Sequence, residues 1–247
     1  MRSSLRQQSS HPRNSDSNGQ HGPIEGLGTE ILRLICRTDT QRTKSFPPSA
    51  TIVRHGEPVA ELYYINRGTA KEILLRSKGT RRSELLVSLL KPGDIIGLRD
   101  LFGAGHHTVT VIAIEEVQAY PLPIEAVQRS VQQHPQLWMQ VAQALAHQIE
   151  LVEEQLLLAQ RRRSAPDRIL RLLILLLRIY GIDEQGFLLF PATPYTIAEL
   201  LQLSPSTVQR VLNSLTRQQL LELRAGKIRV PDSSSLQRLL HPNPRPP

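Results

Sequence analysis

The sequence predicts an α+β protein in which a β-rich domain comes first, a long helix follows, and a small helical domain ends the chain. Three observations support this prediction. Residues 46–123 contain short strand-like runs separated by glycine turns, residues 134–163 carry a heptad-like pattern, and residues 196–215 read as two short helices joined by a tight turn. Regularly spaced strands of this kind favour a small barrel or jelly roll.

The chain divides into five expected parts. We expect a tail at 1–28, a sensory β-barrel domain at 29–133, a dimerisation helix at 134–163, a winged helix-turn-helix domain at 164–240 and a second tail at 241–247. The first tail is rich in Ser, Gln, Asn, Arg, Gly and Pro, which bury too little apolar surface to order themselves. With 247 residues and 40% hydrophobic content, the chain is long enough for more than one core.

Composition excludes several classes of protein. The single cysteine, Cys36, rules out a disulfide framework and an iron-sulfur site made of several cysteines in one chain, and it favours a reducing cytoplasm. The most apolar run, residues 169–182, is interrupted by Arg171 and Arg178 and is too short to span a bilayer. We therefore expect a buried helix there and no membrane partner.

No catalytic or metal-binding pattern is present. The sequence has no P-loop, no Ser-His-Asp order and no paired-carboxylate motif. Metal-dependent enzymes with similar barrels need spaced histidines and a carboxylate on neighbouring strands. The barrel histidines, His55, His106 and His107, lack that spacing, and the adjacent pair should point in divergent directions. We predict no enzyme, no catalytic residue, no metal site and no cofactor.

The barrel strands are predicted from apolar runs bounded by turn residues. Barrels of this size either enclose a small-molecule cavity or have a filled interior, and the sequence leaves both open. The expected strands include Leu62–Ile65, Lys71–Arg76, Leu85–Leu90 and Val109–Ile114.

The long helix carries an apolar seam whose members alternate spacings of four and three residues, as in a coiled coil. We interpret it as a dimerisation helix, because two recognition elements one DNA turn apart bind more tightly than one. The alternative is an ordinary core helix packed on its own barrel. The three arginines 161–163 should end the helix. The seam residues are Trp138, Ala142, Leu145, Ile149, Val152 and Leu156.

The two short helices have recognisable starts. Thr196 can cap the first, and Ser204 can cap the second, with Pro205 in its first turn, where a missing N–H costs nothing. Apolar residues then recur at helical spacing on one face of each helix, so that the helices pack against each other. Those residues are Ile197, Leu200 and Leu201 in the first helix and Val208, Val211, Leu212 and Leu215 in the second.

The outer face of the second helix suits nucleic acid. It presents hydroxyls, amides and cations without an acidic residue, which is the chemistry that contacts base edges and phosphates. Residues 223–230 alternate around a glycine turn and predict a cationic wing. Residues 161–247 hold 13 Lys/Arg against 6 Asp/Glu, whereas residues 1–160 hold 17 against 16. Double-stranded DNA is therefore the leading partner, and a merely solvated basic surface is the alternative. The predicted DNA-binding residues are Ser204, Ser206, Thr207, Gln209, Arg210, Arg217 and Lys227.

The order of parts, together with several motifs, resembles the CRP/FNR family of bacterial transcription regulators from about Phe46 to Leu240. Residues 168–181 are most similar to its cyanobacterial nitrogen-control (NtcA) branch. The resemblance implies a cyclic-nucleotide-binding-like double-stranded β-helix, and a homodimer that binds a palindromic promoter site and recruits or blocks RNA polymerase. The motifs are Gly56-Glu57-Pro58, the run from Leu62 to Gly68, the run from Lys91 to Gly97, and the run from Leu203 to Arg210.

The effector segment, which we define as Gly97, Leu98, Arg99, Thr108 and Val109, departs from the family. The family's cyclic-nucleotide binders carry a glutamate for the ribose and an Arg-Ser pair for the phosphate, and here these places hold Leu98, Thr108 and Val109. The departure argues against cAMP binding in the usual mode. The arginine that holds 2-oxoglutarate in the nitrogen-control branch aligns with Val109; Arg99 could substitute, or it could be a surface residue. An unfamiliar effector and no effector both remain open.

The recognition helix departs as well. The family's arginine at the second helix position is Pro205 here, its partner glutamate is Ser206, and the arginine one turn later is retained as Arg210. Arg210 is the best candidate to read a base, with Gln209 able to assist at adenine. The resemblance assigns phosphate contacts to Ser204 and Thr207, while Arg217 and Lys227 are either phosphate contacts or solvated cations. Gln202 stands where relatives often have glycine, at the cost of some backbone strain.

These observations predict a dimeric, sequence-specific transcription regulator with an altered sensory barrel. The alternative is an interaction protein that keeps the fold but binds another regulator, which the loss of arginine at Pro205 favours and the concentrated positive charge opposes. Whether the protein activates or represses depends on the position of its operator.

Overall fold

The computed structural model describes residues 30–31, 33–34, 43–78, 81–103, 105–158, 164–232 and 235–236. The predicted tails at 1–28 and 241–247 and the arginines 161–163 lie outside this set. Side chains at 76–83 and 154–158 are likewise outside it. Within the described part of the chain, no helix has the length and apolar character needed to cross a membrane.

The N-terminal region forms two four-stranded antiparallel sheets, which confirms the predicted β-rich domain. One sheet has the order β1-β8-β3-β6 and the other the order β2-β7-β4-β5. A short 3-10 helix, η1 (Leu98–Asp100), follows β6. The strands are β1 (Lys44–Phe46), β2 (Thr51–Val53), β3 (Glu61–Arg67), β4 (Ala70–Lys78), β5 (Arg81–Leu90), β6 (Ile95–Ile96), β7 (Thr110–Ala113) and β8 (Val117–Pro123).

The sheets pack face to face because alternate residues of their strands are apolar. Val111 and Ala113 of β7, Val117 and Ala119 of β8, and Ile65 of β3 are all buried in one cluster. Each removes apolar surface from water, which is the main term that stabilises such a core. The part of the barrel interior around this cluster is therefore filled by side chains.

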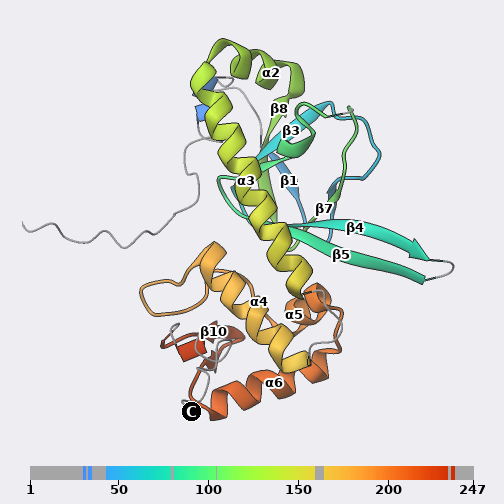
Figure 1. Cartoon of the computed structure of the whole chain (residues 1–247). Helices are drawn as coiled ribbons and strands as arrows, with labels where there is room; N and C mark the ends of the chain where they lie inside the picture. The colour runs from blue at the N-terminus through green and yellow to red at the C-terminus, as the bar shows by residue number, and fades with distance from the viewer. Residues whose placement is uncertain are drawn as a thin grey trace, which may run out of the picture.

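Two helices follow the barrel. The sequence predictions missed α2 (Ile124–Gln133), and α3 (Pro135–Leu158) is the expected long helix. In Figure 1, α3 runs along the barrel toward the C-terminal helices. It buries Leu137, Val141 and Leu151 on one side.

The longer elements of the C-terminal region, within its described residues, are helices and a hairpin. These are α4 (Ala165–Tyr180), α5 (Pro194–Leu201), α6 (Pro205–Arg217), β9 (Glu222–Arg224) and β10 (Lys227–Arg229). The predicted N-terminal cap of α6, Ser204, is confirmed, and so is the predicted hairpin. The cap assigned to Thr196 is wrong: Thr193 Oγ1 accepts the Thr196 N–H at 3.0 Å, and Pro194 occupies the first turn. α4 also begins earlier than expected, because Ser164 caps it.

The two regions touch through the β4–β5 hairpin, which lies beside α5 in Figure 1. Leu86 and Leu89 of β5 belong to the same apolar cluster as α4, α5 and α6. Lys71 of β4, only 5% exposed in its side chain, donates to Glu199 of α5 at 2.6 Å. The amide of Gln202 donates to the backbone oxygen of Glu84. We call these polar contacts, Lys71–Glu199 and Gln202–Glu84, the hairpin contact.

Candidate nucleic-acid interface and effector segment

The N-terminus of α6 gathers three hydroxyl groups. Ser204 Oγ accepts the Thr207 N–H at 3.2 Å and lies 2.8 Å from Thr207 Oγ1 and 3.0 Å from Ser206 Oγ. The unpaired backbone N–H groups and the dipole of a helix make this end favourable for an anion. Ser204 and Ser206 are exposed and Thr207 is half-buried, so the predicted phosphate donors lie together at one end of the helix.

The outer face of α6 is polar, and its cations are unpaired with acids. Arg210, Asn213 and Arg217 are exposed, and no residue of α6 is acidic. Gln209 is half-buried and donates to Asn213 Oδ1 at 2.9 Å. Among the described residues, neither Arg210 nor Arg217 makes an ion pair. Both guanidinium groups are therefore free to meet an external anion.

The inner face of α6 holds the helix in place. Its predicted apolar residues are all buried, in the cluster shared with α4 and α5. The helix is therefore a packed platform that presents its polar face outward. The buried residues are Val208, Val211, Leu212 and Leu215.

The turn before α6 has the expected backbone geometry. Gln202 has φ +52°, in the left-handed region that favours glycine. Its side chain is used in the hairpin contact, which glycine could not make. The sequence identified the strained position but gave no sign of this contact.

The wing is less cationic than its sequence indicates. Arg224 donates to Glu222 at 2.7 Å, and Arg229 donates to the same carboxylate at 3.0 Å. Lys227 is exposed at the tip, and no ion pair joins it to another described residue. Lys227 is thus the wing cation best placed for a phosphate.

The effector segment does not converge on one pocket. Leu98 and Val109 are buried in two different apolar clusters, and Thr108 is exposed. Gly97 has φ +83°, and a Cβ there would lie 2.9 Å from Leu62 Cδ2, so this position requires glycine. Arg99 is the member of the effector segment that forms an ion pair, with Glu72.

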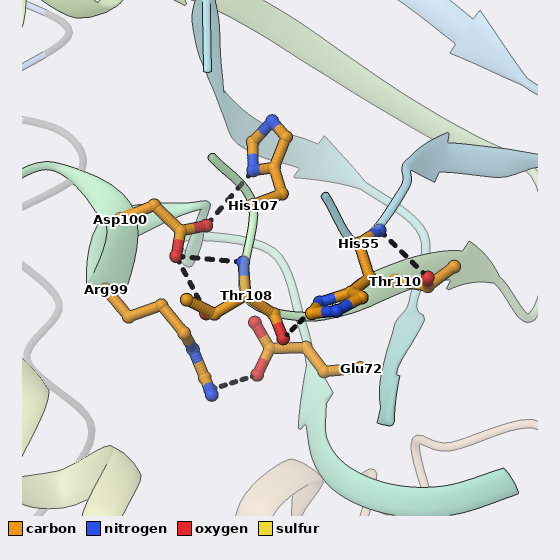
Figure 2. A network of polar contacts seen from close by, with 7 residues as sticks. All are labelled: His55, Glu72, Arg99, Asp100, His107, Thr108 and Thr110. Carbon is orange, nitrogen blue, oxygen red and sulfur yellow. Dashed lines mark hydrogen bonds and ion pairs between the residues drawn. The ribbon is translucent and has the colours of Figure 1, made fainter. Parts of the chain in front are cut away.

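Arg99 pairs with Glu72 of β4, as Figure 2 shows. The side chain of Arg99 is 22% exposed and that of Glu72 only 2%, so the alternative of a solvated surface arginine is wrong. Burial raises the pKa of Glu72 to about 7, while the charge of Arg99 opposes this shift. Sequence reasoning missed Glu72, because it follows Lys71 in a strand that also contains other charged residues, and nothing local marks it as buried.

A second network surrounds Asp100. Its carboxylate lies 3.0 Å from His107 Nδ1 and accepts the Thr108 hydroxyl at 2.7 Å (Figure 2). Burial on its own raises the pKa of Asp100, but the hydrogen bonds from His107 and Thr108 outweigh it, and the pKa falls below its ordinary value. His107 is buried and His106 exposed, as expected for divergent neighbours. In the part of the chain that the structure covers, no three His, Cys, Asp or Glu residues are grouped to hold a metal.

The predicted seam of α3 is only partly exposed. Trp138, Ala142 and Ile149 are exposed, and Leu145 and Val152 are half-buried. Leu145 and Val152 pack against the apolar clusters of the barrel, beside the buried stripe of Leu137, Val141 and Leu151. Trp138 also stacks on Phe102 with ring centroids 4.7 Å apart, and the side chain of Leu156 lies outside the described residues.

Two family models match this chain. The cyclic nucleotide-binding domain matches residues 43–134, and the Crp-like helix-turn-helix domain matches residues 167–239. The first covers the two sheets, the effector segment and α2. The second covers α4 through the hairpin.

Whole-length relatives agree with the two domain matches. A CRP-like cAMP-activated global transcriptional regulator of Mycobacterium tuberculosis is 25% identical over 85% of this chain and 93% of that protein. A global nitrogen regulator of Synechocystis is also 25% identical, over 83% of this chain and 88% of that protein. The solved structure of FixK2 from Bradyrhizobium japonicum has a TM-score of 0.68 at 22% identity and covers 81% of this chain and 97% of that one. At that identity the structural likeness shows the fold alone.

Proposed function

Because the chain belongs to the CRP/FNR family of transcription regulators, we propose that it binds a palindromic promoter site as a homodimer in a sequence-specific manner. The observation that carries this proposal is the outer face of α6, which is exposed, free of acids and cationic. Such a face fits the base edges and phosphates of a major groove. The protein acts in the cytoplasm and contacts RNA polymerase at the promoter.

Each DNA-binding residue has a proposed role. Arg210 reads guanine through O6 and N7, and Gln209 assists at a neighbouring base. The hydroxyls at the start of α6 donate to a phosphate that also meets the helix N-terminus. Arg217 and Lys227 neutralise further phosphates. The phosphate-contacting hydroxyls belong to Ser204, Ser206 and Thr207.

The proposed dimer uses the seam of α3. Exposed Trp138, Ala142 and Ile149 follow one stripe, and a second copy of the helix would cover them. The adjacent stripe of Leu137, Val141 and Leu151 is already buried within the protein itself, whereas Trp138, Ala142 and Ile149 are exposed. We also propose domain boundaries at 29–133, 134–163 and 164–240; the end of α2 at Gln133 and the start of α3 at Pro135 support the first of these.

The effector segment argues against cAMP as the ligand. One relative carries cAMP activation in its name. In this chain, buried Leu98 and Val109 offer no polar group to a ribose or phosphate, and the Thr108 hydroxyl is bonded to Asp100. 2-Oxoglutarate is the alternative effector, and it would have to displace Glu72 from Arg99.

A second candidate function follows from Pro205. Pro205 stands where the family carries a base-reading arginine, and the loss of that arginine favours a protein that binds another regulator in place of DNA. Concentrated positive charge in residues 161–247 favours DNA.

Selection of random duplex DNA by the purified protein, followed by sequencing, tests the proposal. We expect a palindromic motif whose affinity falls steeply as salt rises, because bound phosphates release counterions. A variant with its seam disrupted, Ile149→Glu, should select single half-sites or none. No enrichment with any duplex, with or without 2-oxoglutarate, would favour the second candidate.

A further inference from the structure

A carboxylate of the barrel itself faces the cation of the effector segment. Glu72 is buried on β4, and its Oε2 accepts from Nη2 of Arg99 on η1. The two residues are 27 positions apart in sequence, and the extended side chain of Arg99 reaches from η1 to Glu72 (Figure 2). The contact therefore belongs to the folded barrel and not to a local turn.

The pair leaves hydrogen-bonding groups unused. Arg99 Nε is buried and has no hydrogen-bond partner among the described residues. Ser88, which lies opposite Glu72 on β5, also has a buried hydroxyl without a partner there. Directly opposed residues on antiparallel strands project to the same face of the sheet. Two unused donors thus lie beside one carboxylate.

The geometry of a guanidinium explains why this matters. An arginine binds a carboxylate or phosphate best through two parallel N–H bonds. Glu72 uses one nitrogen of Arg99 and leaves Nε free. An external anion could use Nε and Nη2 together, provided that the charge of Glu72 were absent.

We propose that Glu72 is an internal counter-ion for Arg99 and closes a latent binding site for small carboxylates and phosphates in the barrel. Two more carboxylates, Asp94 and Asp100, are near enough to Glu72 to add to the negative potential. The barrel thus carries its own substitute for an anionic ligand.

This inference also bears on regulation, and in that respect it rests on the proposed function. Because Glu72 already balances the charge of Arg99, the barrel does not need an anionic ligand to do so. DNA binding by the unmodified protein should then be independent of added anionic metabolites.

Direct ligand titration tests the proposal without DNA. Calorimetry would follow 2-oxoglutarate and inorganic phosphate binding to the full chain, unmodified and as Glu72→Gln, at a pH above neutral. We expect at least one of these anions to bind Glu72→Gln about tenfold or more tightly than it binds the unmodified protein. In the double variant Glu72→Gln with Arg99→Gln, the gain should disappear.

A matched control separates this effect from the general effect of removing one negative charge from the protein. Glu61 pairs with Lys44 at 2.6 Å on the surface, so Glu61→Gln removes the same charge and should leave anion binding unchanged. Circular dichroism would check folding, and Glu72→Met, of similar size, replaces the glutamine variant if that variant unfolds.

Equal anion affinity in the unmodified protein and the Glu72 variants would overturn the proposal. So would a gain that persists without Arg99. Because these titrations contain no DNA, their result is separate from that of the duplex selection, and either proposal can fail alone.

Discussion

Arg210 on the outer face of α6 and Arg99 in the barrel are the two arginines on which our proposals depend. The two differ in whether the protein itself supplies a negatively charged partner. Arg210 is exposed on a helix without acids, and no described residue pairs with it. Arg99 is mostly buried and pairs with Glu72. The difference teaches that a cation alone does not mark an anion site. What decides is whether the fold supplies the counter-charge.

The same contrast recurs within the wing. Arg224 and Arg229 share the carboxylate of Glu222, while no described residue forms an ion pair with Lys227 at the tip. A count of basic residues would treat the three alike. Their internal contacts leave Lys227 as the cation most available to DNA.

The largest expected effect comes from removing Arg99, the cation of the barrel pair. Arg99→Met leaves the Glu72 carboxylate buried without its partner, and breaking a buried pair in this way costs about 3 to 5 kcal/mol of unfolding free energy. Urea denaturation would measure the loss. In the matched exposed pair, Lys44→Met should cost at most about 1 kcal/mol, and similar losses for the two variants would contradict the contrast.

The second test is the pH dependence of stability. The pKa of Glu72 is raised from 4.5 to about 7, and that of Asp94 from 3.8 to about 6, both by burial. The folded protein therefore binds more protons than the unfolded chain in this range, and stability should fall as pH rises from about 5 to 7. Over the whole titration of Glu72, from below pH 4.5 to above pH 7, the loss is about 3 kcal/mol. Thermal unfolding across this range would detect it, and Glu72→Gln should reduce the slope to the part that Asp94 contributes; an unchanged slope would exclude Glu72 as a source.

The third test removes the cation of α6. Arg210→Ala should weaken binding to the selected site by about 1 to 3 kcal/mol and relax specificity at one base pair. Fluorescence anisotropy on selected and random duplexes would measure both effects. Thr207→Ala, which removes a proposed phosphate donor, should weaken all duplexes alike. If Arg210→Ala did the same, Arg210 would not read a base.

The smallest expected effect concerns the turn. Gln202→Gly relieves a left-handed backbone, which favours the variant by about 1 kcal/mol, but it also removes the bond to Glu84, which costs about as much. Stability should change by less than about 1 kcal/mol. Gln202→Ala loses the bond and keeps the strain, so denaturation should show it to be the less stable of the two.

The sequence predicted most of the architecture because local signals carried it. Short apolar runs bounded by turn residues indicated the barrel strands, Ser204-Pro205 indicated the start of α6, and one apolar face per helix indicated the helix pair. These signals lie within a few residues of each other. The cap of α5 was assigned to Thr196 because a second threonine three residues earlier, Thr193, offers the same chemistry.

The interior of the barrel resisted prediction because its contacts are long-range. Nothing in the sequence near Arg99 indicates Glu72, and nothing near Gln202 indicates Glu84. Whether a lone charge is solvated or buried against a partner depends on which strands become neighbours. The predicted effector residues shared a short stretch of sequence, yet Leu98 and Val109 ended in separate clusters.

Lys71 and Glu72 are consecutive residues of β4, and consecutive strand residues face opposite sides of a sheet. Lys71 reaches α5 through the hairpin contact, whereas Glu72 reaches Arg99 inside the barrel. A single-residue insertion or deletion earlier in this strand would exchange the two faces. It would place an ammonium group in the interior and a carboxylate against Glu199. Over evolutionary time this strand should therefore accept substitutions far more readily than changes of length.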